Sequence, residues 1–192
     1  MSADPLDVDL AQPKMWLQAT TAREPDGKEF DLPRFEKHLL CDEDGLFPEL
    51  FNSWEDKVLL TELEREETVA WYRNPARASQ DSLGIKYDDG DEVKIVRPDF
   101  VFFAQMDDGS YVADIVDPHG HHLGDALPKL KGLARYAEAN GPLYRRIEAV
   151  TELNGVFKLL DLREEATRDA VYSASSVVAL YESDAAVDYL TE

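Results

Sequence analysis

Cysteine is almost absent from this chain, which has 192 residues and a single cysteine, Cys41. One thiol excludes an internal disulfide and any zinc site built from several cysteines, and it favours a reducing compartment. Long apolar runs are absent too, since none approaches the ~18 residues that a membrane-spanning helix needs. The N-terminus, MSADPLDVDL, lacks the basic stretch and apolar core of a signal peptide. We therefore expect a cytoplasmic protein that is neither exported nor embedded in a membrane.

Basic residues are also scarce. The chain has 20 Lys and Arg against 40 Asp and Glu, which gives a formal net charge of -20. Such a charge opposes non-specific binding to nucleic acid and other polyanions, so any DNA contact has to be local. A small basic spot is predicted around the turn at Asn74-Pro75, where it consists of Arg73, Arg77 and Lys86. Unpaired surface charges are an equally consistent interpretation of these three residues.

The length fits one domain that buries a sizeable core, with appended segments. Residues 1–31 are rich in Asp, Pro, Thr and Gly and are interpreted as an arm or linker. Residues 32–162 carry the periodic apolar patterns of a folded domain. Residues 163–192 are predicted to be a helical extension that packs on the same domain.

Apolar spacing and turn residues predict alternating helices and strands. The expected helices lie at 33–40, at 54–71 with Ser53 as its cap, at 124–139, and beyond 163, with one starting near Ser183-Asp184. The expected strands lie at 83–87, 93–104 and 111–116, which form an antiparallel meander, and at 147–150 and 156–160 around Asn154-Gly155. This order predicts an α/β sandwich, in which a sheet is covered by a helix on each face.

A pair of acids carries the strongest chemical signal. Asp99 stands at the start of a buried apolar strand, and counting back from the turn at 107–109 places it opposite Asp117, with His119 two residues further on the same side. Two carboxylates held side by side repel each other unless a divalent cation or a shared proton relieves them. The turn count is uncertain by about two residues, so Asp114 stays open as a reserve ligand.

Paired carboxylates are suited to hydrolysis of phosphodiester bonds, because they hold Mg²⁺ ions that activate water and neutralise charge on the phosphate. Glu55, in the first turn of the helix predicted at 54–71, is expected to complete the coordination. Its simpler interpretation is an acid that stabilises the N-terminus of that helix.

Five motifs occur in order along the chain: Trp54-Glu55, Trp71-Tyr72-Arg73-Asn74-Pro75, Ile85-Lys86-Tyr87, Pro98-Asp99-Phe100 and Asp117-Pro118-His119-Gly120-His121-His122-Leu123. In this arrangement the chain resembles, over about residues 35–162, the nuclease domain of type III restriction enzyme helicase subunits. Those domains belong to the PD-(D/E)xK superfamily.

The resemblance implies a restriction endonuclease-like fold with a central mixed sheet, and a DNA endonuclease that uses Mg²⁺ or Mn²⁺. The implied metal ligands are Asp99, Asp117 and Glu55. It also implies a helicase or ATPase partner, fused or associated, as part of a restriction-type defence system. The sequence contains no Gly-x-x-x-x-Gly-Lys-Ser/Thr phosphate loop of its own.

The chain departs from the family pattern at one catalytic position. The second motif of the family has a lysine where His119 stands here, and a neutral imidazole does not supply a permanent cation. Lys129 or Lys131, on the next predicted helix, is an alternative source of that charge. Two other interpretations stay open: an inactive nuclease-like interaction module, and a zinc site built from His119, His121 and His122.

Overall fold

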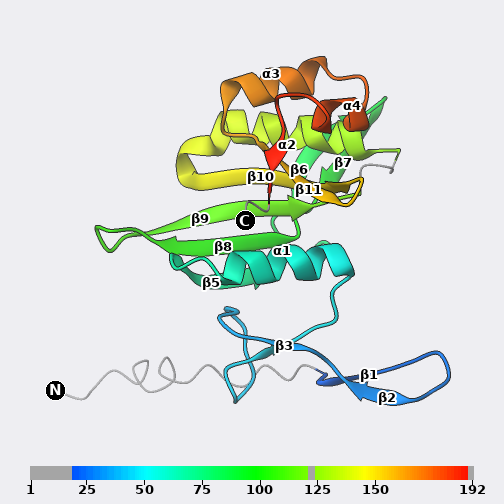
Figure 1. The fold of residues 1–192 in the computed structure, drawn as a ribbon, viewed down its shortest axis with the longest axis vertical. Coiled ribbons are helices and arrows are strands. Elements are labelled where there is room, and N and C mark those ends of the chain that lie inside the picture. The colour runs from blue at the N-terminus through cyan, green and yellow to red at the C-terminus, as the bar shows by residue number, and fades with distance from the viewer. Residues whose placement is uncertain (1–18, 121–123, 190–192) are drawn as a thin grey trace. The chain divides into compact units, whose positions relative to one another are not determined.

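The computed structural model of the protein describes residues 19–120 and 124–189, and the chain divides into two compact units, Met1–Leu50 and Phe51–Glu192. In the first unit, β1 (Thr21–Arg23) and β2 (Glu29–Asp31) form an antiparallel hairpin, and β3 (Arg34–Phe35) pairs with β4 (Phe47–Pro48) (Figure 1). The described part of the expected arm, residues 19–31, thus contains a strand pair.

The helix expected at 33–40 is wrong. Lys37 has a positive φ of 63°, which interrupts any right-handed helix at that point. Phe35 pairs with Phe47 across the β3–β4 ladder, and the ring of His38 stacks on that of Phe47 with centroids 3.6 Å apart. Burial of these rings outweighs the weak tendency of a short segment to form an isolated helix.

A six-stranded mixed sheet forms the centre of the second unit, in the order β12-β11-β10-β9-β8-β5. Its strands are β5 (Thr68–Arg73), β8 (Phe100–Gln105), β9 (Tyr111–Pro118), β10 (Tyr144–Leu153), β11 (Val156–Asp161) and β12 (Val187–Asp188). Neighbours are antiparallel except β9 and β10, which run parallel. A parallel pair needs a crossover, and α2 (Ala126–Asn140) supplies it. The fold is therefore α/β with a mixed sheet, as the sequence predicts.

One expected helix and one expected strand are each divided into shorter elements. The helix expected at 54–71 is α1 (Ser53–Leu63), and Thr68–Arg73 is strand β5, which pairs with β8. The strand expected at 83–87 lies in a separate two-stranded sheet, so its predicted place in the antiparallel meander is wrong. The long strand expected at 93–104 is split into β7 (Glu92–Val96) and β8. Pro98 lies in the break, where a residue without an N–H cannot continue a ladder. The side chain of Asn74 donates to the Pro98 carbonyl at 2.8 Å and fixes this bend.

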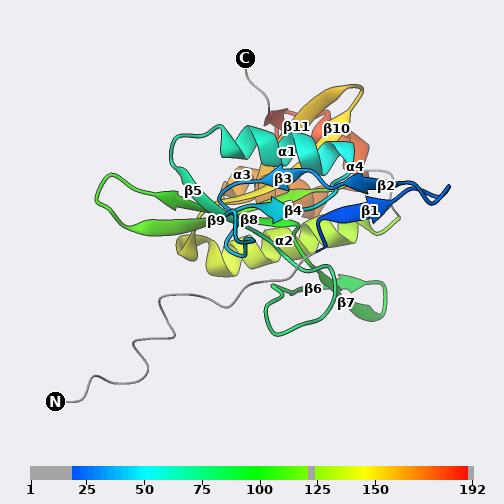
Figure 2. The same ribbon diagram turned by 90° about the horizontal axis from the view of Figure 1, so that it is seen from below.

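Helices cover both faces of the sheet. Figure 2 shows α1 on one side of the strands and α2 on the other. The hairpin of β6 (Ile85–Asp89) and β7 packs on α2, and the approach is close enough to require a glycine. A Cβ at Gly132 would lie 2.5 Å from that of Tyr87. On the α1 face the core is aromatic, with Trp71 and Phe100 fully buried and their ring centroids 6.0 Å apart.

The C-terminal part closes the far edge of the sheet. The β10–β11 hairpin turns at Asn154 and Gly155, both with positive φ, which confirms the predicted turn. After it come α3 (Glu165–Ser173), α4 (Val177–Tyr181) and strand β12, so the helix expected near Ser183 is wrong. A short 3₁₀ helix, Gly141–Leu143, follows α2. No helix among the described residues is long and apolar enough to cross a bilayer.

Candidate functional site

Asp99 and Asp117 meet at one end of the sheet. The β8–β9 ladder places Phe100 opposite Val116, so one step back along β8 brings Asp99 beside Asp117. The backbone N–H of Asp99 donates to Oδ1 of Asp117 at 3.0 Å. The register expected from the turn count is therefore confirmed, and it holds the two acids next to each other.

Burial and nearby negative charge make both acids hold protons more tightly than usual. The pKa of Asp99 is raised to about 6, first by burial and then by the charge of Glu55, against the lowering effect of Arg73. The pKa of Asp117 is raised well above its ordinary value, first by burial and then by the charge of Asp99. We call Asp99 and Asp117 the acid pair.

Glu55 reaches the same end of the sheet from the start of α1. Asn52, rather than the expected Ser53, caps this helix, and the Glu55 side chain accepts from the Asn52 backbone N–H, which completes a capping box. The other carboxylate oxygen of Glu55 is 2.5 Å from Nη2 of Arg73. Glu55 thus stabilises the helix N-terminus, as its simpler interpretation predicts, and its expected role as a metal ligand stays a prediction.

Arg73 lies between Glu55 and the acid pair. Its Nη1 is 2.8 Å from Oδ1 of Asp99, while its Nη2 binds Glu55. Only 21% of the Arg73 side chain is exposed. The residue expected on the DNA-binding surface is therefore turned inward as a bridge between two acids. Arg77 and Lys86, the other members of the expected basic spot, are exposed.

His119 follows β9 directly and is held in place by its backbone. Its N–H donates to the carbonyl of Val150, and its own carbonyl accepts from Oγ1 of Thr151 at 2.7 Å. Its Nδ1 lies 3.9 Å from Oδ2 of Asp117, and its Nε2 lies 3.2 Å from the hydroxyl of Tyr181. The imidazole thus spans the space between the acid pair and α4.

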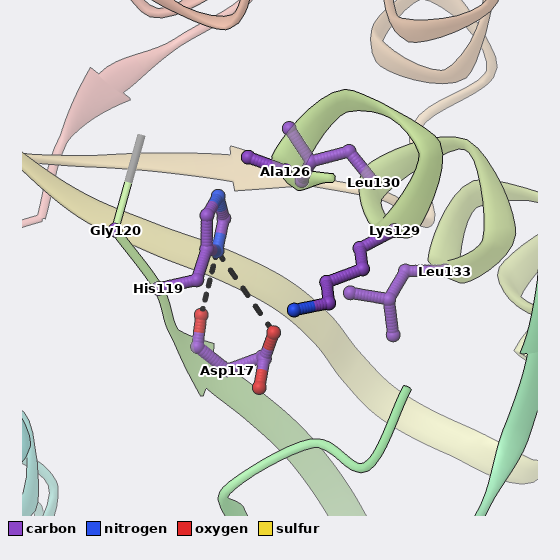
Figure 3. A pocket seen from close by; sticks show the side chains of 7 residues that line it. All are labelled: Asp117, His119, Gly120, Ala126, Lys129, Leu130 and Leu133. Atoms are coloured by element: carbon purple, nitrogen blue, oxygen red, sulfur yellow. Dashed lines mark hydrogen bonds and ion pairs between the residues drawn. The ribbon is translucent and has the colours of Figure 1, made fainter. Parts of the chain in front are cut away.

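Lys129 projects into the same pocket from α2. The pocket is lined by Asp117, His119, Gly120, Ala126, Lys129, Leu130 and Leu133, and Figure 3 shows the Lys129 side chain extending toward Asp117. Its charge lowers the pKa of both members of the acid pair. Its amine also binds Oδ2 of Asp125 at 3.0 Å. Lys131 instead donates to the carbonyl of Ala174, so of these two lysines it is Lys129 that lies beside the acid pair.

Asp114, the reserve ligand, belongs to a different cluster. It is fully buried and accepts hydrogen bonds from Arg145 and Arg146. Arg146 also binds Glu62 of α1 and Glu148, its neighbour on β10. Three residues along a strand separate positions by about 10 Å and turn the side chain to the opposite face, which keeps Asp114 away from Asp117. Its geometry is that of a buried ion pair.

Some predictions fall outside this geometry. His121 and His122 lie outside the described residues, so the structure provides no positions for the remaining members of the expected zinc site. In the described ranges, 19–120 and 124–189, no group of three or more His, Cys, Asp or Glu side chains converges as a set of metal ligands. The acid pair remains as two carboxylates whose third acidic neighbour, Glu55, is bound to Arg73.

Sequence reasoning missed Tyr181 altogether. Its hydroxyl lies within hydrogen-bond distance of His119 and donates to the carbonyl of Ala149 at 3.1 Å. His119 and Tyr181 are 62 positions apart, and the sequence predicts only helical structure around Tyr181. No local signal connects Tyr181 with the site, because the contact depends on the packing of α4 against the sheet at β11.

Comparison with known proteins finds a matching family and a similar protein. The model of the YagJ family matches residues 36–190. Protein YagJ of Escherichia coli (strain K12) is 51% identical over 189 residues, which cover 98% of this chain and 77% of that protein. No solved structure matches the chain. With the match extending over both the aromatic core and the acid pair, the chain belongs to the YagJ family.

Proposed function

We propose that this protein is a divalent-metal-dependent DNA endonuclease of the restriction endonuclease-like class. The observation that carries the proposal is the acid pair, in which Asp99 and Asp117 are hydrogen-bonded neighbours at the end of the sheet, with raised pKa values. The ordered motifs that resemble a type III restriction nuclease domain support the same conclusion. Burial of two adjacent acids costs free energy, and acids with raised pKa values are concentrated at functional sites.

The donor set of the site fits a hard divalent cation. Asp99 and Asp117 offer carboxylate oxygens, which Mg²⁺ and Mn²⁺ prefer, and Glu55 lies one guanidinium away. Mg²⁺ in such sites usually keeps several waters and takes only one or two carboxylates from the protein. When bound, the ion would supply an activated water and neutralise charge on the phosphate. A set of two acids, with Glu55 in reserve, is sufficient for this kind of binding.

In the family that the chain resembles, one lysine of the second motif supplies a permanent positive charge at the site. Here Lys129 and His119 share the role of that lysine. Lys129 brings a permanent positive charge near Asp117 from α2, and it lowers the pKa of both acids. His119 occupies the motif position itself, where the backbone bonds to Val150 and the contact with Tyr181 fix its ring. We assign the cationic role to Lys129 and the orientation of the attacking water to His119.

DNA is the proposed substrate, although the chain is strongly acidic. Arg77 and Lys86 are exposed and are the proposed phosphate contacts, while the rest of the surface limits binding to this local spot. The helicase or ATPase partner and the restriction-type defence setting stay proposals drawn from the resemblance. A cytoplasmic location is part of the same proposal, because the similar protein comes from a bacterium and bacterial DNA lies in the cytoplasm.

Nicking of supercoiled plasmid tests the proposal. Purified protein is incubated with plasmid and Mn²⁺ or Mg²⁺, beside D99N, D117N and an EDTA control. We expect metal-dependent nicking by the wild type and at least a roughly hundredfold loss in each variant. If the wild type is inactive and H119K nicks the plasmid, the protein is a decayed nuclease. If neither protein nicks while calorimetry shows no metal binding, the nuclease proposal is wrong and the interaction module takes its place.

A further inference from the structure

Arg73 binds two acids that come from different elements. Its guanidinium spans Glu55 on α1 and Asp99 directly before β8, at 2.5 and 2.8 Å. The side chains of all three are mostly buried, with 21% of Arg73, 13% of Glu55 and 24% of Asp99 exposed. Solvent screens ion pairs buried to this degree much less than exposed ones. The two ion pairs therefore restrict the positions of the Arg73 and Asp99 side chains.

Aromatic packing fixes the guanidinium from the side. Its Cζ lies 5.5 Å from the ring centroid of Phe51 and 5.1 Å from that of Phe100. Both distances are within the range of a cation–π contact. The two ion pairs and the two ring contacts therefore hold the Arg73 guanidinium in a defined position at the site.

The charges at the site show what Arg73 compensates. Glu55, Asp99 and Asp117 bring three carboxylates to one end of the sheet, and Arg73 binds two of them. Lys129 has its own carboxylate partner, Asp125. A guanidinium that occupies an oxygen of Asp99 and a divalent cation that needs the same oxygen are mutually exclusive at short range.

We propose that Arg73 is an internal counter-ion that competes with the divalent metal for Asp99. This inference rests on the proposed metal-dependent function. In the metal-free protein Arg73 neutralises Asp99, and metal binding displaces it from that carboxylate. Arg73 keeps its second partner, Glu55, and its packing on the two phenylalanine rings. The affinity of the site for the metal is therefore lower than its carboxylates alone would provide.

Removal of the guanidinium tests the competition. In R73M the unbranched apolar side chain preserves packing against Phe51 and Phe100, and in R73K one charge remains without the planar fork that spans two acids. Calorimetric titration with Mn²⁺ should show binding about tenfold tighter in R73M than in the wild type, with R73K between them. R135M is the matched control, because it removes the same charge from an exposed position on α2 that has no part in the proposed metal or DNA contacts.

The comparison distinguishes the inference from the function on which it rests. Circular dichroism verifies that each variant is folded, and the D99N background identifies the site, because R73M should no longer tighten binding when Asp99 is replaced. If the wild type binds Mn²⁺ at the acid pair and folded R73M and R73K bind equally well or more weakly, Arg73 is not a competitor, and the proposed function stands. If neither the wild type nor the Arg73 variants bind Mn²⁺, the metal site itself is refuted, and the inference with it.

Discussion

The backbone N–H of Asp99 donates to the carboxylate of Asp117 at 3.0 Å, so the two acids are fixed to each other by the sheet as well as opposed by their charges. The hydrogen bond needs only an oxygen acceptor, whereas the repulsion needs the charge. A substitution that keeps the oxygen and removes the charge separates the two effects.

Asp117→Asn is such a substitution, and we expect it to stabilise the metal-free protein. Its amide oxygen still accepts from Asp99, while the buried negative charge disappears. The expected gain is about 1–2 kcal/mol at neutral pH, measured by urea denaturation in EDTA, together with loss of Mn²⁺ binding. Asp91→Asn, in an exposed turn, serves as the control and should change stability little. A destabilised D117N protein would mean that the charge of Asp117 is fully compensated in the folded state.

Lys129→Met should reduce plasmid nicking by about a hundredfold while Mn²⁺ binding stays within about threefold of the wild type. The reason is that Lys129 adds positive charge beside the acid pair without being a ligand. Lys131→Met is the matched control from the same helix, since Lys131 donates to the Ala174 carbonyl instead. Equal rates in the two variants would remove Lys129 from the proposed mechanism.

Arg146→Met should destabilise the protein strongly, by about 3–5 kcal/mol, because it strips buried carboxylates of their partner. Arg146 binds Glu62, Asp114 and Glu148, each of them buried. The measurement is the urea midpoint and slope relative to the wild type. Arg135→Gln breaks only an exposed pair with Asp88 and should cost less than about 1 kcal/mol. Similar losses in both variants would show that the buried cluster has no special role in stability.

His38 should make the first unit sensitive to acid. Burial lowers its pKa to about 4, and the Leu40 carbonyl offsets this only in part. The folded state binds the proton on His38 less tightly than the unfolded state, in which the pKa of histidine is about 6.5. The contribution of neutral His38 to the free energy of unfolding is therefore fully present above pH 6.5 and is lost as the pH drops toward 4. The expected loss is about 3 kcal/mol.

The variant His38→Phe tests this acid sensitivity, because it keeps a ring to stack on Phe47 but does not titrate. Carboxylates also titrate in this range, so the informative quantity is the difference between the two proteins, followed by NMR signals of the first unit from pH 7 to pH 4. That difference should change with pH in favour of the variant. Parallel curves would exclude His38 as the source.

Turn chemistry made the central contact predictable. Gly109 has a positive φ of 81°, in the short turn between β8 and β9, and a short turn fixes the register of its two strands. Counting from it is sufficient to place Asp99 beside Asp117. The turn at Asn154-Gly155 was predictable for the same reason. In both cases the relevant information lies within a few residues of the sequence.

Contacts that depend on packing were not predictable. Arg73 lies 18 residues from Glu55 and 26 from Asp99, and its inward position follows from the packing of α1 beside β5. The apolar spacing of Thr68–Arg73 alone is compatible with a helix or a strand. The segment is a strand because it pairs with β8. The restriction endonuclease-like topology stays a proposal for a related reason, since strand order is a property of the assembled sheet.

The contact between Tyr189 and Glu62 has a consequence for synthesis on the ribosome. The Tyr189 hydroxyl donates to Glu62 at 2.7 Å across 127 positions of sequence, and Glu62 also binds Arg146. Helix α1 emerges early, yet its buried acid acquires these partners only after most of the second unit has been translated. Until then Arg65, three residues further along, is the early partner of this carboxylate at 3.1 Å, and completion of this helix face waits until residue 189 has left the exit tunnel.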